Sequence, residues 1–145
     1  MSEHYIDPTR AAFDLFKSLP RDTPINMLNL VRYRDVAAYP EGHEHVAKGW
    51  SGARAYEEYG TTSAAIFERL GGKIVWRGSF ETVLTGPADE QWDAAFVAAY
   101  PNAGAFLAMV TDADYKLAVV NRQAAVETSR LIRFAPLAIE GVKFA

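Results

Sequence analysis

An arginine lies where the sequence predicts the buried face of a helix. The segment TDADYKLAVVNRQAA, residues 111–125, has helical spacing, and Arg122 shares one stripe of it with residues that favour burial: Tyr115, Ala118 and Val119. A buried charge is costly unless it is paired and hydrogen-bonded. Its guanidinium therefore bonds either to backbone carbonyls or a carboxylate such as Glu81 or Asp114, or to a carboxylate, enolate or phenolate oxygen of a ligand.

Two further polar residues lie within predicted strands. Arg77 shares a face of the segment 73–84 with Glu81, so this pair forms either a salt bridge at a strand edge or the polar lining of a pocket. Asn29 lies between apolar neighbours and needs hydrogen-bond partners, which are either a neighbouring backbone or a substrate oxygen. Arg122, Arg77 and Asn29 are therefore the candidate catalytic residues.

Aromatic residues with polar tips are the candidate substrate-binding residues. Those selected are Tyr33, Tyr59, Trp76 and Tyr115. A small-molecule pocket combines apolar walls with a few polar groups, which these side chains supply. Aromatic side chains at regular spacing are also typical of an ordinary core, so both interpretations stay open.

The sequence favours chemistry without a metal or cofactor. The stretch EGHEH supplies His43 and His45, but the only other histidine is His4, so a third ligand for a metal is scarce. A Ser-His-Asp triad or a haem axial histidine would have to use this loop, which disfavours both. The chain has no cysteine, which excludes thiol catalysis and zinc–thiolate sites, and it has no glycine-rich phosphate-binding motif.

Composition predicts one ordinary globular domain over residues 1–145. Half of the residues are hydrophobic, and the net charge of -3 disfavours broad binding to nucleic acid or to anionic membranes. The longest apolar stretch is interrupted by Pro101, Asn102 and Gly104, so it is a poor membrane span. The N-terminal segment lacks the pattern of a signal peptide, and we expect a cytoplasmic protein.

The elements that must position these residues follow a recognisable order. Asp7 and Pro8 resemble the start of a first helix, and Thr111 with Asp114 resembles a capping box that starts the last one. After the first helix, the pattern predicts a strand, a long loop, a helix, two strands, a helical region and a strand, at residues 24–34, 35–51, 51–72, 73–84, 92–100, 102–125 and 129–134. This βαββαβ order predicts an α+β, ferredoxin-like fold with a four-stranded antiparallel sheet.

Both faces of the predicted sheet are apolar. In the segment 73–84, Ile74, Trp76, Phe80 and Leu84 are expected to point one way, and in the segment 92–100 both faces carry apolar side chains. In this topology the helices cover one face only. We therefore expect a homodimer that packs sheet on sheet, and the alternative is that the first helix and the C-terminal tail cover the second face.

Several segments resemble the domain-of-unknown-function 1330 family. They are the helix-ending double glycine followed by WRG, the strand-ending Tyr-Pro, and the combination of Asp114, Tyr115 and Arg122. The resemblance covers about residues 25–134 and implies a dimeric α/β-barrel, to which this chain adds an N-terminal helix and a C-terminal tail. The wider superfamily includes cofactor-free monooxygenases, haem-degrading enzymes, isomerases and binding proteins, so fold alone does not select a reaction.

Two functional hypotheses follow. In the first, the protein is a cofactor-independent oxygenase or isomerase that acts on a small apolar or aromatic anion in a pocket between sheet and helices. In the second, the same pocket of a homodimer binds such a ligand without transforming it, as a binding or regulatory protein. Product formation distinguishes the two hypotheses.

Overall fold

The computed structural model describes residues 3–143, in which a layer of helices packs against one sheet. The helices are α1 (Arg10–Ser18), α2 (Gly52–Arg69), α3 (Ala103–Thr111) and α4 (Ala113–Ala125), with a short 3-10 helix η1 (Val46–Lys48). The strands are β1 (Ile25–Tyr33), β2 (Lys73–Gly78), β3 (Ala94–Tyr100) and β4 (Val126–Phe134). They form an antiparallel sheet in the order β2-β3-β1-β4, which confirms the predicted α+β, ferredoxin-like fold.

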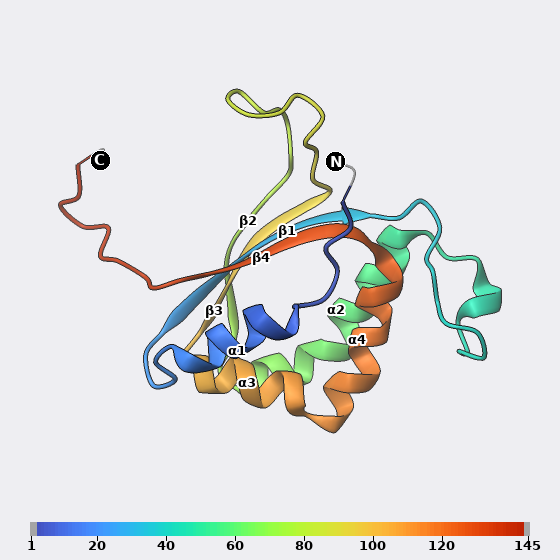
Figure 1. Ribbon diagram of the computed structural model, residues 1–145, viewed down its shortest axis with the longest axis horizontal. Coiled ribbons are helices and arrows are strands. Elements are labelled where there is room, and N and C mark those ends of the chain that lie inside the picture. The colour runs from blue at the N-terminus through green and yellow to red at the C-terminus, as the bar shows by residue number, and fades with distance from the viewer. Residues whose placement is uncertain (1–2, 144–145) are drawn as a thin grey trace.

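The four α-helices lie on the same side of the sheet (Figure 1). Strand β1 shows why, since its alternate residues Ile25, Met27, Asn29 and Val31 are buried while the residues between them are only partly buried. Ile25 and Met27 belong to the main hydrophobic core with Phe106 of α3 and Tyr115 of α4. Burial of this face ties the sheet to the helices that carry the candidate residues.

Local sequence sets most of the helix starts. The side chains of Ser51 and Asn102 accept hydrogen bonds from Arg54 N (3.1 Å) and Ala105 N (2.8 Å), as expected for N-caps. Two predicted caps are wrong. Helix α1 is capped by Thr9 rather than Asp7, and α4 is capped by Asp112, because Thr111 is the last residue of α3.

Strand β2 is shorter than predicted and carries a bulge. It ends at Gly78 rather than near residue 84, and its register shifts between Ile74 and Trp76. Ile74 pairs with Ala98 on the helix side, whereas Trp76 pairs with Val97 on the other side, so the expectation that Ile74 and Trp76 share a face is wrong. Residues 79–93 leave the sheet as a loop that projects beyond its open face (Figure 1).

The sheet face opposite the helices is uncovered in the single chain. Helix α1 lies on the helix side, and the C-terminal segment extends away from the body of the protein (Figure 1). Trp76, Ile132 and Phe134 are therefore 52%, 41% and 51% exposed. The alternative in which α1 and the tail cover this face is not what the structure shows.

Candidate functional site

Arg122 is buried on α4, and its side chain contacts the N-terminal segment. Arg122 is 8% exposed. Its Nη1 donates to the carbonyl oxygen of Ile6 (2.5 Å), and its Nη2 donates to Ser129 Oγ (3.1 Å). The Ser129 hydroxyl in turn donates to the carbonyl oxygen of Tyr5 (2.8 Å). Helical spacing puts Arg122 on the inner face of α4, and these contacts tie that helix to β4 and to the chain that precedes α1.

The guanidinium lines a cavity between α1 and β4. The cavity has a volume of about 870 Å³, and Ser129 lies in its wall beside Arg122. Its apolar walls come from α1, β1, α3 and β4: Phe13, Phe16, Met27, Phe106 and Leu131. Such a volume is in the range of small-molecule sites, and its lining combines apolar surface with a buried cation.

No carboxylate among residues 3–143 forms an ion pair with Arg122. Neither Glu81 nor Asp114, the carboxylates considered from the sequence, is a partner. A guanidinium carries five N–H donors, and the two protein acceptors seen here are neutral. The charge of Arg122 is therefore buried without a counter-ion, at the wall of a cavity where an anion would compensate it.

Four tyrosines form a second cluster beside Arg122. Ring centroids are 5.3 Å apart for Tyr33 and Tyr56, 5.5 Å for Tyr56 and Tyr59, and 6.1 Å for Tyr59 and Tyr115. The hydroxyls of Tyr59 and Tyr115 are hydrogen-bonded at 2.7 Å. Burial raises the pKa of both phenols, and the positive charge of Arg122 offsets part of the rise, so both hydroxyls are protonated and neutral at ordinary pH.

The remaining predicted site residues lie apart from the cavity. Asn29 is buried and its Nδ2 donates to the carbonyl oxygen of Met27 (3.1 Å). Arg77 is exposed opposite Phe96, and Glu81 lies beyond the end of β2, so no shared strand face brings these two charges together. Trp76 lies on the open face of the sheet. The structure therefore brings Arg122 to the cavity, whereas Tyr33, Tyr59, Trp76, Tyr115, Arg77 and Asn29 are outside its lining.

Residues 50–134 match the family described as Domain of unknown function (DUF1330). The chain belongs to the DUF1330 family. A protein of unknown function from Rhodopseudomonas palustris is 51% identical, covers 94% of this chain over 99% of its own length, and has a TM-score of 0.86. The methylated form of that protein gives 51% identity, 94% and 98% coverage, and a TM-score of 0.87.

A more distant structure, described as a dimeric protein of unknown function with a ferredoxin-like fold from Bacteroides fragilis, is 14% identical. It covers 77% of this chain and 95% of its own, with a TM-score of 0.46. No curated protein matches the sequence. The comparisons thus establish the DUF1330 family, while the function has to be argued from the site.

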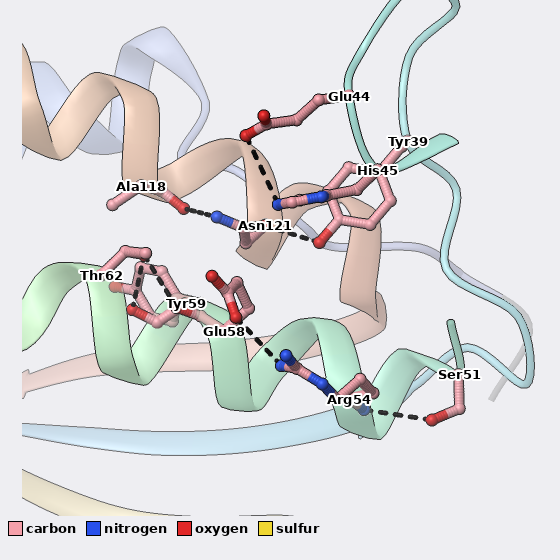
Figure 2. A network of polar contacts seen from close by, with 10 residues as sticks. All are labelled: Tyr39, Glu44, His45, Ser51, Arg54, Glu58, Tyr59, Thr62, Ala118 and Asn121. Carbon is pink, nitrogen blue, oxygen red and sulfur yellow. Dashed lines mark hydrogen bonds and ion pairs between the residues drawn. The ribbon is translucent and has the colours of Figure 1, made fainter. Parts of the chain in front are cut away.

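The loop between β1 and α2 of this DUF1330 protein is held by polar and aromatic contacts (Figure 2). Tyr39 Oη donates to Asn121 Oδ1 (2.6 Å), and Asn121 Nδ2 donates to the carbonyl oxygen of Ala118 (3.1 Å). The ring of His45 lies 4.4 Å from that of Trp50. Within residues 3–143, no group of three or more His, Cys, Asp or Glu side chains is arranged to hold a metal ion.

Sequence reasoning missed the part of the site that comes from the two ends of the DUF1330 chain. Phe13 and Phe16 of α1 and Leu131 of β4 line the cavity, and Ile6 supplies a carbonyl partner of Arg122. The amphipathic pattern of α1 signals an apolar face but does not reveal what that face covers. Among the helices of the described residues, none combines the length and apolar character needed to cross a bilayer.

Proposed function

We propose that the protein binds a small apolar or aromatic anion in the cavity between α1 and β4. In this proposal, Arg122 holds the anionic oxygen of the ligand. The observation that carries it is the coincidence of a buried guanidinium lacking a carboxylate partner with a cavity of about 870 Å³ that the same guanidinium lines. Inside a low-dielectric wall, a charge-assisted hydrogen bond from arginine to an oxyanion is among the stronger contacts a protein makes.

The surroundings of Arg122 support binding more strongly than catalysis. The Ser129 hydroxyl accepts from Arg122 and donates to the backbone of Tyr5, so its hydrogen bonds hold a segment of the chain in place. Of the carboxylates in the cavity lining, Glu3 is exposed and Asp7 accepts a hydrogen bond from Gln123 (3.2 Å). Oxygenase or isomerase activity, with Arg77 and Asn29 as further catalytic residues, stays a prediction that product formation would test.

We also propose that the binding unit is a homodimer formed through the open faces of two sheets. Trp76, Ile132 and Phe134 expose large apolar side chains on that face, and no segment within residues 3–143 covers it. A monomer rarely leaves a contiguous apolar patch of this kind in water, and a two-fold pair of sheets removes it. A cytoplasmic location and the absence of nucleic-acid partners stay predictions from the composition.

Fluorescence titration with 1-anilinonaphthalene-8-sulfonate, an apolar aromatic anion, tests the binding proposal. We expect saturable binding to the unmodified protein and at least tenfold weaker binding to Arg122→Gln. Lys116→Gln is the matched control, because it removes one positive charge from an exposed position of the same helix. Arg122→Lys keeps the positive charge but lacks the planar guanidinium. Its affinity for the probe should therefore lie between those of the unmodified protein and Arg122→Gln.

Equal affinity of the unmodified protein and a folded Arg122→Gln variant would contradict the proposal. Circular dichroism of each variant establishes that it is folded before its affinity is compared. Native mass spectrometry of the purified protein complements the titration, because it reports the dimer mass and any ligand that is retained. Incubation of such a retained ligand with fresh protein then separates binding from turnover.

A further inference from the structure

The cavity lies between two walls, α1 and β4, that run in the same direction, because Ser129 contacts the chain before α1 and Arg133 contacts the end of α1. Its lining along α1 extends from the N-cap Thr9 to the C-cap Leu19, and its lining on β4 runs from Ser129 to Arg133. A nine-residue helix is about 14 Å long, and five residues of a strand extend over about 13 Å. The two walls of this groove are therefore longer than one ring of an aromatic compound.

The buried Arg122 and the aromatic wall of the groove lie at different ends. Arg122 contacts Ser129 and the carbonyl of Ile6, which places its guanidinium at the end where β4 begins and before α1 starts. Toward the other end, the ring of Phe16 lies 5.0 Å from that of Phe106, and Leu131 continues the apolar wall. A ligand with one charged head and an apolar body fits this arrangement.

The other two arginines of the lining are already engaged. The Arg133 guanidinium donates to the carbonyl oxygens of Phe16 (3.3 Å) and Pro20 (2.7 Å) at the end of α1. The Arg130 guanidinium lies 4.9 Å from the centre of the Tyr5 ring and 5.3 Å from that of Trp92, and its Nη1 donates to the carbonyl oxygen of Ser129 (2.9 Å). Among the three, Arg122 alone is buried, which favours a ligand with a single anionic group.

Helix α1 gains few contacts from the protein itself. None of its residues is buried, although Phe13 and Phe16 are partly buried and line the groove. Arg122 and Arg133 hold the chain before and after the helix through backbone carbonyls. Both rings are only partly buried, so a hydrocarbon chain lying along the groove would bury more of their apolar surface.

From this geometry we infer that the ligand is a straight-chain aliphatic carboxylate of medium length. The carboxylate lies at Arg122, and the alkyl chain extends between α1 and β4 toward Phe16 and Leu131. The inference rests on the proposed binding function and deepens it by choosing an extended aliphatic chain over a compact aromatic ring. An alkyl chain of about ten carbons matches the length of a nine-residue helix.

Calorimetric titration of the full-length protein tests the inference with butanoate, hexanoate, octanoate, decanoate, benzoate and neutral decanol as probes. We expect the affinity to rise with chain length by up to about fourfold per methylene, which corresponds to about 0.8 kcal/mol for each buried CH2. Benzoate and decanol should bind at least tenfold more weakly than decanoate. Arg122→Gln should weaken decanoate binding at least tenfold and leave decanol unchanged.

A blocked groove provides the second arm. Leu131→Trp fills the apolar end, so it should abolish decanoate binding while butanoate binds as before. Leu117→Trp is the matched control, because Leu117 is 73% exposed on α4 and outside the lining, and its affinities should be those of the unmodified protein.

The results separate the inference from the function on which it rests. Benzoate binding that depends on Arg122, with no effect of chain length or of Leu131→Trp, would overturn the aliphatic ligand and keep the proposed function. Anion affinities that are identical in the unmodified protein and in folded Arg122→Gln would overturn both. Decanoate binding that depends on chain length and is lost in Arg122→Gln and in Leu131→Trp would support the aliphatic ligand and the proposed function together.

Discussion

The hydrogen bond between the Tyr59 and Tyr115 hydroxyls should show strong energetic coupling. The two oxygens are 2.7 Å apart, Tyr115 is 7% exposed, and Tyr59 packs against the same core. Tyr115→Phe removes one hydroxyl and leaves the other without a partner in an apolar environment. A buried polar group left unsatisfied costs about 1–3 kcal/mol.

The double variant should cost much less than the sum of the singles. In Tyr59→Phe/Tyr115→Phe both hydroxyls are gone, so the loss is only the net contribution of one hydrogen bond, about 0.5–1.5 kcal/mol. With single costs of about 2 kcal/mol each, the coupling energy is about 2.5–3.5 kcal/mol, at the upper end of the range seen for residues in contact. The free energy of unfolding from urea denaturation, followed by circular dichroism, measures each term.

Tyr33→Phe is the matched control for this cycle. Its hydroxyl has no hydrogen bond within the described residues, and its ring contacts Tyr56 rather than Tyr59. Combined with Tyr59→Phe, it should be additive within about 0.5 kcal/mol. Additivity of Tyr59→Phe and Tyr115→Phe to the same precision would refute the reasoning, because it would mean that neither hydroxyl depends on the other.

The remaining predictions concern pH, two glycines and the sheet face. Burial raises the folded-state pKa of Tyr100 and Tyr115 above 10, so their contribution to the free energy of unfolding should be constant between about pH 8 and pH 10 and fall above pH 10 by up to about 1.4 kcal/mol per pH unit for each tyrosine. Equal stability at pH 8 and pH 11 would contradict this. Gly60→Ala should stabilise the protein by about 1 kcal/mol in thermal unfolding, since Gly60 is exposed within α2 and an added Cβ has no neighbour within 4 Å. Gly52→Ala should instead destabilise it, because the added Cβ would lie 2.2 Å from the Arg34 carbonyl oxygen, and a melting temperature at or above that of the unmodified protein would show the contact to be unimportant. Ile132→Glu should convert a dimer to a 16.0 kDa monomer in sedimentation at micromolar concentration, and a monomeric unmodified protein would disprove the dimer.

Features that depend on neighbours in the chain could be predicted from the sequence. The alternation along β1, the stripe that buries Arg122 on α4, and the cap at Asn102 each depend on a few adjacent residues. Gly71 ends α2 with a φ of 84°, as the double glycine predicted. Because these patterns are local and the βαββαβ order has one common topology, the ferredoxin-like fold followed from them.

Tertiary structure decided where the candidate residues meet. The bulge in β2 reversed the expected side for Trp76, because pairing with β3 sets the register and a single inserted residue moves a side chain to the other face. Strand β2 also ends at Gly78, so Glu81 lies outside the strand and shares no strand face with Arg77. Neither event leaves a periodic signal in the segment itself.

The partners of Arg122 show the same division most clearly. Helical periodicity alone determined that its guanidinium is buried, yet its carbonyl partner Ile6 is 116 residues away in sequence. The cavity exists because α1 lies beside β4, and these elements stand at opposite ends of the chain. The sequence thus determined that a buried charge needs partners, whereas only the packing of distant segments decided that those partners are neutral and that a cavity adjoins them.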